Sequence, residues 1–216
     1  MLTSRLVIAG AGDFSRELLW LCSSLSSDQR HWASVCFIDD DVELARSRMQ
    51  RYQIDTPVIG NIHEFVPSDG DLLICAIGSP RAKLSVCERL RGKGGKFTNI
   101  VHSTVTIGPR TQLGQGVIVA QSSLISVDVL IGDFVTINAS SGCGHDAVLE
   151  DGCTISSQCD ITGHAHLERG VFLGSHAAIL PGVRVGEFAV VGAGTVAFRN
   201  IKAGQTVLGV PAKVLL

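Results

Sequence analysis

A histidine followed directly by an aspartate, His145-Asp146, is the pair of residues in this chain that most clearly suggests chemistry. The pair closes a run of small and polar residues, NASSGCGHD. An exposed histidine beside a carboxylate can be held in one tautomer, which suits a general base. A histidine that is only solvated is the alternative interpretation, and the sequence around His145 favours the base.

A glycine-rich turn near the start of the chain suggests a second site. Gly10-Ala11-Gly12 follows an apolar run and opens an amphipathic segment, with Ser15 in the third place of a G-x-G-x-x-G pattern. Such a turn can hold a phosphate at a helix N-terminus, although Asp13 would repel one and is itself a good helix cap. A sugar-nucleotide site, a dinucleotide site and a purely structural turn all stay open, and the first is favoured. Asp39 and Asp40 lie where such folds contact ribose or base.

Three further histidines, His164, His166 and His176, allow a different chemistry, because three histidines can hold a zinc ion. His164 and His176 occupy the same place in the repeat described next, but on different sides of the coil. We therefore expect them not to converge within one chain. We expect no metal, and a zinc site between subunits is the alternative.

The chain has a six-residue period from Ile107 to Gly192. Every sixth residue is aliphatic, with one cysteine as the exception: Ile107, Leu113, Val119, Ile125, Ile131, Ile137, Cys143, Leu149, Ile155, Ile161, Leu167, Leu173, Ile179, Val185 and Val191. Residues two apart in a strand share a face, so each hexad turns one of these residues and the smaller residue two places earlier inward. A hexapeptide period is typical of a parallel β-helix, and three hexads form one coil.

The residue after each inward aliphatic is often glycine, for example at Gly108, Gly132 and Gly144. We expect this position to bend the chain, since a tight corner often needs a positive φ. With the bend at Gly144, His145 should stand on an outer corner of the coil.

The seven cysteines show no CxxC spacing, and Cys143, Cys153 and Cys159 fall on inward positions of the repeat. We interpret them as small buried thiols, because buried cysteine behaves as a small apolar residue. Disulfides and zinc ligation are the less favoured interpretations.

The first part of the chain is organised differently. Apolar runs at 5–9, 35–38, 57–60, 72–77 and 96–101 predict strands, and amphipathic segments after Gly12 and from Pro80 to about Arg91 predict helices. Strands alternating with helices predict a small parallel α/β unit, Rossmann-like in its first half. We place this domain at residues 1–103, and the β-helix with its C-terminal tail at residues 104–216.

Composition argues against several classes of partner. The chain has 216 residues and a formal net charge of −2, so no basic field points to nucleic acid or to acidic lipid. Its first residues lack the apolar length of a signal peptide, and no segment approaches the ~20 residues of a membrane span. We expect a cytoplasmic protein without a nucleic-acid or membrane partner.

With these residues in place, the chain resembles the hexapeptide-repeat sugar acyltransferases. Within them it is most similar to bacterial nucleotide-amino-sugar N-acetyltransferases and sialic acid O-acetyltransferase-like proteins. The likeness rests on NASSGCGHDAVLEDG, ITGHAHLERGVFLGSHAAILPGVRVG, VVGAGTV and GVPAK. It implies a small α/β Rossmann-like N-terminal domain followed by a left-handed parallel β-helix of hexapeptide repeats. It also implies a homotrimer, with acetyl-CoA in the cleft between neighbouring prisms.

The resemblance also assigns roles to residues. It implies that His145 is the catalytic base and that Asp146 supports it. It places acetyl-CoA against Thr154, Gly163, Ser175, Gly192, Ala193 and Gly194. It places a nucleotide sugar against Gly10, Ala11, Gly12, Asp39, Asp40 and Gly78. The first turn departs from the family pattern, since Gly-Asp-Phe stands where many relatives have Gly-His or Gly-Phe.

The main hypothesis is direct transfer of an acetyl group from acetyl-CoA to the amine of a nucleotide-linked amino sugar, for cell-surface glycan precursors. A backbone N–H of a neighbouring coil would stabilise the oxyanion. No cysteine lies in the setting of a nucleophile, so we do not expect an acetyl-enzyme. The alternatives are O-acetylation of a sialic-acid-like sugar, a γ-type zinc carbonic anhydrase and a non-catalytic scaffold. The sugar, the nucleotide, the acyl group and the pathway stay open.

Overall fold

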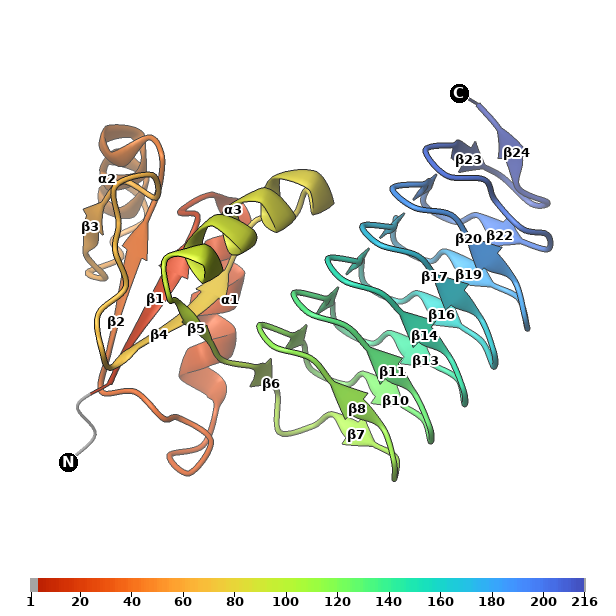
Figure 1. The fold of residues 1–216 in the computed structure, drawn as a ribbon, viewed down its shortest axis with the longest axis horizontal. Helices are drawn as coiled ribbons and strands as arrows, with labels where there is room; N and C mark the ends of the chain where they lie inside the picture. Colours follow the sequence, from red (N-terminus) through yellow and green to blue (C-terminus); the bar gives the residue numbers. More distant parts are fainter. Residues whose placement is uncertain (1–3, 216) are drawn as a thin grey trace. The chain divides into compact units, whose positions relative to one another are not determined.

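The computed structural model describes residues 4–215, and the chain divides into two compact units (Figure 1). One unit comprises the chain up to Gly78 together with Ser85–Asn99. The other comprises Ser79–Leu84 together with the chain from Ile100 onward. In the described part of the chain, no helix has both the length and the apolar character needed to cross a membrane.

The first unit is built on a parallel sheet. The elements from the start of the chain are β1 (Arg5–Ala9), α1 (Asp13–Ser24), β2 (Ser34–Ile38), α2 (Val42–Arg51), β3 (Val58–Gly60), β4 (Asp71–Cys75), α3 (Pro80–Gly92) and β5 (Lys96–Phe97). The strand order β3-β2-β1-β4-β5, with every pair parallel, confirms the Rossmann-like prediction. The central strand β1 is buried from Leu6 to Ala9, because a parallel strand in such a fold is covered on both faces.

Helix α2 has no counterpart among the predicted elements. It begins after Asp41, whose side chain accepts a hydrogen bond from the backbone N–H of Leu44 at 3.0 Å, as a helix N-cap does. Only Ala45 and Met49 of its residues are buried. Two buried residues give too sparse an apolar pattern for periodicity to reveal the helix.

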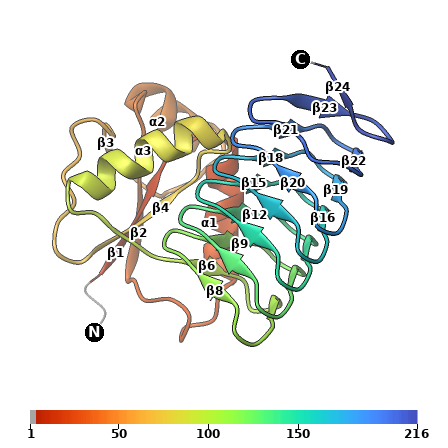
Figure 2. The same ribbon diagram turned by 45° about the vertical axis from the view of Figure 1, so that its right-hand side comes forward.

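The second unit is a parallel β-helix whose short strands form three sheets, one on each side of the coil (Figures 1 and 2). The first side contains β6 (Ile100–Val101), β9 (Ile118–Val119), β12 (Thr136–Ile137), β15 (Thr154–Ile155), β18 (Phe172–Leu173), β21 (Val190–Val191), β23 (Thr206–Leu208) and β24 (Lys213–Val214). The second contains β7 (Thr106–Ile107), β10 (Leu124–Ile125), β13 (Gly142–Cys143), β16 (Asp160–Ile161), β19 (Ala178–Ile179) and β22 (Val196–Ala197). The third contains β8 (Gln112–Leu113), β11 (Leu130–Ile131), β14 (Val148–Leu149), β17 (His166–Leu167) and β20 (Arg184–Val185).

From β6 to β22, strands on one side pair in parallel with the strand one coil further along. Thr136 lies opposite Thr154, and Val148 lies opposite His166, so partners are 18 residues apart. One coil therefore contains three hexads, as predicted. Any two residues separated by this interval stack one above the other along the coil.

The inward positions form one core, as the register predicts. The larger inward residues from Val119 to Val191 are buried, and Val117, Val129, Ala147, Ala165 and Ala177 are among the small ones buried beside them. Ile107 is an exception, because it is 40% exposed. Its strand β7 is the end strand of its sheet, so a neighbouring coil covers it on one side only.

The prediction that Gly144 and its counterparts bend the chain is wrong. Residues with positive φ lie three places after each inward aliphatic: Arg110, Gly116, Ser122, Asp128, Phe134, Ser140, Asp146, Gly152, Gln158, His164, Gly170, His176, Gly182, Phe188 and Gly194. The glycines directly after the aliphatics have another cause. A Cβ at Gly144 would lie 2.6 Å from the backbone nitrogen of Gly163, and one at Gly174 would lie 2.6 Å from that of Ala193. Close approach of the next coil therefore requires these glycines.

The repeat also extends further than predicted at both ends. The single strand predicted at 96–101 is divided, because Lys96–Phe97 join the first sheet and Ile100–Val101 pair with β9 of the coil. At the other end, Val196–Ala197 continue the hexads beyond Val191. Strand β23 then pairs in parallel with β21, and β24 folds back antiparallel on β23, so the predicted C-terminal cap contains two short strands.

Candidate active site

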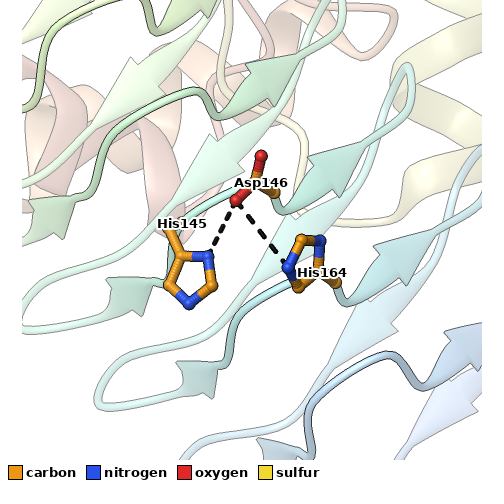
Figure 3. A group of neighbouring side chains, drawn as sticks. All are labelled: His145, Asp146 and His164. Atoms are coloured by element: carbon orange, nitrogen blue, oxygen red, sulfur yellow. Dashed lines mark hydrogen bonds and ion pairs between the residues drawn. The ribbon is translucent and has the colours of Figure 1, made fainter.

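His145 and Asp146 lie on the corner of the coil between β13 and β14, and Asp146 has a left-handed backbone with a φ of 58°. Their side chains are 56% and 46% exposed. The predicted outer-corner position of His145 is therefore confirmed. The two residues contact each other directly, since His145 Nδ1 lies 2.8 Å from Asp146 Oδ2 (Figure 3).

The contact with Asp146 selects the tautomer of the neutral His145 ring. An ionised carboxylate can only accept a hydrogen bond, so the proton lies on Nδ1 and Nε2 keeps its lone pair. The nitrogen that faces away from Asp146 is therefore the one able to take a proton from a substrate. This is the arrangement that general-base catalysis requires.

Gly163 stacks one coil beyond His145 and leaves room for the ring. A Cβ at Gly163 would lie 2.6 Å from His145 Nε2 and 2.8 Å from Cε1. The sequence-based prediction gave Gly163 a role in binding acetyl-CoA. The structure adds a reason for glycine at this position, because any side chain would press on the proposed base.

His164 is a residue of this corner that the sequence analysis did not assign to it. It stacks one coil beyond Asp146, and its Nε2 lies 3.8 Å from the same Oδ2 that His145 contacts. The two imidazole rings meet edge to face, with centroids 5.0 Å apart and an interplanar angle of 89°. The 18-residue length of one coil predicts this neighbour, because His164 follows Asp146 by 18 residues.

The same corner continues toward the start of the coil as a column of charged residues. Arg110 makes a two-pronged contact with Asp128, with both N–O distances at 2.5 Å. This hydrogen-bonded guanidinium lowers the pKa of Asp128, and the carboxylate in turn raises the pKa of Arg110. The charge of Asp128 is therefore balanced by Arg110.

The residue types at this corner also match a metal site. Among the residues described, His145, Asp146 and His164 are the one group of three with ligand atoms all within 4.8 Å of one another. The zinc alternative considered from the sequence combined His164 with His166 and His176, and neither of these two joins His164 at this corner. His166 Nε2 instead contacts Glu150 at 2.7 Å, and His176 lies on a different corner, between β18 and β19.

The other residues predicted to bind acetyl-CoA do not surround His145 within one chain. Ser175 and Gly192-Ala193-Gly194 lie on the corner between the first and second sides, and the N–H of Gly194 donates to the carbonyl of Ser175 at 2.9 Å. His145 lies on the corner between the second and third sides. Thr154 differs again, because it is 4% exposed.

Lys83 binds the hydroxyl of Thr154 and is absent from the predicted site. It is 1% exposed, and its Nζ donates to Thr154 Oγ1 at 2.8 Å, to Thr136 Oγ1 at 3.1 Å and to the carbonyl of Cys153 at 3.1 Å. Because Lys83 lies at the start of α3, distant in sequence from the hexads, the repeat contains no signal for it. The hydroxyl of Thr154 is thus part of the interior.

All but Ala11 of the residues predicted to bind a nucleotide sugar line one cavity of the first unit, with a volume of about 340 Å³. Gly10, Gly12, Asp39, Asp40 and Gly78 line it, together with Asp13, Phe14, Arg48, Ile62, Ala76 and Ile77. Asp39 is already engaged, because its carboxylate accepts from the N–H of Ala11 at 2.7 Å and from that of Asp41 at 2.9 Å. The Ala11 amide therefore points at Asp39, and the other charged residues that line the cavity are Asp13, Asp40 and Arg48.

The cysteines are buried and free, as predicted. Burial raises the pKa of Cys143 and of Cys153 to about 12, and that of Cys159 to about 11. A thiol must ionise to act as a nucleophile, so these side chains are unsuited to forming an acyl-enzyme.

Known proteins match both parts of the chain. Residues 5–90 match the family model described as the PglD N-terminal domain. PerB from Caulobacter crescentus, solved with CoA and GDP-perosamine, is 27% identical with a TM-score of 0.82, over 98% of this chain and 97% of that chain. The acetyltransferase domain of PglB from Neisseria gonorrhoeae FA1090, solved with acetyl coenzyme A, is 25% identical with a TM-score of 0.84, over 98% of both chains.

The serine acetyltransferases match part of this chain in sequence. The serine acetyltransferase of Buchnera aphidicola subsp. Acyrthosiphon pisum is 32% identical over 112 residues, which are 52% of this chain and 38% of that protein. The chain thus spans about two fifths of the length of the serine acetyltransferases that it matches. Together, the matches confirm the predicted fold, an α/β domain followed by a left-handed β-helix, and the predicted resemblance to the hexapeptide-repeat sugar acyltransferases.

Proposed function

We propose that this chain is a hexapeptide-repeat sugar acyltransferase that moves an acetyl group from acetyl-CoA to the amine of a nucleotide-linked amino sugar. The observation that carries the proposal is the His145–Asp146 contact at 2.8 Å on an exposed corner, with Nε2 of His145 directed away from the carboxylate. The chain is also similar, over 98% of its length, to two proteins whose structures contain CoA or acetyl-CoA.

His145 acts as the general base through Nε2. The amine nitrogen of the sugar attacks the thioester carbonyl carbon, and His145 takes the proton that this nitrogen loses. The C–S bond then breaks, and the proton returns from the imidazolium to the leaving thiolate. The products are an N-acetylated sugar and free CoA. Asp146 holds the Nδ1–H and balances the charge of the imidazolium during the reaction.

The N–H of Gly163 is the candidate for stabilising the oxyanion. It lies one coil beyond His145, and no acceptor within the described part of the chain takes its hydrogen bond. A fixed backbone donor beside the base stabilises charge on the carbonyl oxygen without reorganising during the reaction. This role deepens the prediction that Gly163 contacts the acetyl donor.

The donor site is shared between two copies of the chain in a homotrimer. The proposal is supported by the division of the predicted donor residues between two corners, with His145 and Gly163 on one and Ser175 and Gly192-Ala193-Gly194 on another. A bulky substitution at Ala193, which is exposed, would disable one half of such a site, and His145→Ala would disable the other. Mixed trimers of Ala193→Trp and His145→Ala should then regain activity that neither variant has alone. Sites complete within one chain would show no such recovery.

The nucleotide of the acceptor binds in the cavity of the first unit. Asp40 and Arg48 line that cavity, and Arg48 is its one cation among the residues described. We place the phosphates toward Arg48, since the Ala11 amide is occupied by Asp39 and Asp13 stands in the first turn of α1.

The direct experiment is a screen of nucleotide-linked amino sugars with acetyl-CoA, with release of the CoA thiol as the signal. Hydroxylamine distinguishes the products, because it cleaves an acetyl ester and leaves an acetyl amide intact. An amide product with at least one nucleotide sugar is the expected result. Thiol release only with amino sugars that lack a nucleotide, or an ester product, would contradict the proposal.

A further inference from the structure

We infer that His164 is a positioning residue for the base: it holds Asp146 and the ring of His145 in their productive arrangement. This inference rests on the proposed function of His145. The two histidines flank one carboxylate oxygen, with His145 Nδ1 at 2.8 Å and His164 Nε2 at 3.8 Å from Asp146 Oδ2 (Figure 3).

The backbone fixes His164 relative to the base. The N–H of His164 donates to the carbonyl of His145 at 2.9 Å, across the gap between successive coils. The neighbouring strands β16 and β17 are paired in their sheets on both sides of this corner. His164 therefore starts from a rigid point one coil beyond Asp146, and only its side-chain torsions are free to vary.

The ring of His164 supports the ring of His145. The rings meet edge to face at a centroid distance of 5.0 Å, which is a favoured geometry for aromatic pairs. Because the His145 side chain is 56% exposed, it has few other contacts to select its rotamer. Contact with the His164 ring thus limits how far the base can swing toward solvent.

No other basic side chain competes for this role in the described residues. The next charged residues along the column are Asp128 and Arg110, and Arg110 donates to the Asp128 carboxylate through both Nε and Nη2. Among the residues that the structure describes, His145 and His164 are the two whose side chains form an ion pair or hydrogen bond with the Asp146 carboxylate. Loss of His164 should therefore leave Asp146 with a single side-chain partner.

The test exploits a matched pair of histidines. His164 and His176 both occupy left-handed corner positions, with φ of 59° and 60°, and both are exposed. Asparagine tolerates this conformation, so His164→Asn and His176→Asn introduce the same small backbone cost. His164→Gln is the conservative variant, because its amide N–H can still reach toward Asp146.

We expect His164→Asn to lower kcat by about two- to tenfold, the range for loss of one aromatic pair contact. Both KM values should stay near wild type, because no substrate contact is removed. His164→Gln should recover activity, whereas His176→Asn is a control for the NMR measurement alone, because His176 follows Ser175 on the corner proposed to bind the donor. In ¹⁵N NMR spectra, the share of His145 protonated at Nδ1 should fall in His164→Asn and not in His176→Asn.

The NMR measurement separates this inference from the proposed function, since it needs no substrate. An unchanged His145 tautomer and an unchanged kcat in a folded His164→Asn protein would overturn the positioning role. So would a His164→Gln protein that is as slow as His164→Asn. If His145→Ala is itself fully active, the proposed function fails instead, whatever the NMR spectra show.

Discussion

Gly163 faces the proposed base so closely that a Cβ atom there would lie 2.6 Å from Nε2 of His145. Gly163→Ala should therefore displace the imidazole ring. Misplacement of a reacting group by about 1 Å can cost up to roughly a hundredfold in rate, so we expect a large fall in kcat with the fold preserved. Steady-state kinetics and a thermal melt of the same sample measure both quantities.

Gly142→Ala is the control for this substitution, because a Cβ at Gly142 meets only Asp160 Oδ1 at an ordinary distance of 3.7 Å. Gly142 begins the strand that leads to the His145 corner. Equal losses of kcat in Gly142→Ala and Gly163→Ala would mean that contact with the His145 ring is not the cause.

Lys83 should be important for the stability of the coil. Lys83→Met keeps the length of the side chain but removes the donor to Thr136, Thr154 and the carbonyl of Cys153. Buried acceptors without this donor cost about 1–3 kcal/mol. Urea unfolding should show a loss of this size, whereas Lys202→Met at an exposed position should change stability by less than about 0.5 kcal/mol. Equal stabilities of the two variants would exclude this role for Lys83.

The buried thiols should resist modification in the folded protein. Burial raises the pKa of Cys143 and of Cys153 to about 12, from an ordinary value of 9.0. A disulfide reagent at pH 8 should therefore label these residues only after denaturant is added. Because the folded-state pKa is the higher one, the associated stability is complete below pH 9.0 and is lost at higher pH, as unfolded thiols ionise. Rapid labelling without denaturant would contradict the buried hexad register.

Asp39 should act on nucleotide-sugar binding through the turn that it holds. Asp39→Asn retains one carbonyl oxygen, so it cannot accept from both Ala11 and Asp41. We expect the KM for the nucleotide sugar to rise about three- to tenfold, the range for one hydrogen bond, with the KM for acetyl-CoA unchanged. Asp55→Asn, an exposed position of the same unit, is the control. If the KM for acetyl-CoA rises together with the KM for the nucleotide sugar, the substitution acts on more than the nucleotide cavity.

The hexad period was sufficient to predict the coil, its inward residues and the corner position of His145. Periodicity succeeds here because each six-residue unit repeats the same inward pair, so one register determines every strand. The role of the glycines was misread for a physical reason. Both a positive φ and a close approach of the next coil favour glycine, and sequence alone does not distinguish Gly144 from Gly152.

The contacts that the sequence did not reveal are those made across coils or from another element. His164 reaches Asp146 because residues 18 apart stack, an interval that the six-residue pattern contains only implicitly. Lys83 reaches Thr154 from α3, outside the repeat altogether. In the first unit, the pattern predicted the Gly10–Gly12 turn, yet not that the carboxylate of Asp39 would occupy the amide of Ala11.

The rate of acetyl transfer by His145→Ala tests the central claim, that His145 is the general base, most directly. The corner is exposed and His145 does not contribute to the core, so the variant should fold as wild type does. Loss of a general base should lower kcat by roughly 10²–10⁴, while the affinity for acetyl-CoA stays near that of wild type. If His145→Ala keeps more than about a third of the wild-type kcat with the natural acceptor, a loss far smaller than that of a general base, His145 is not the base.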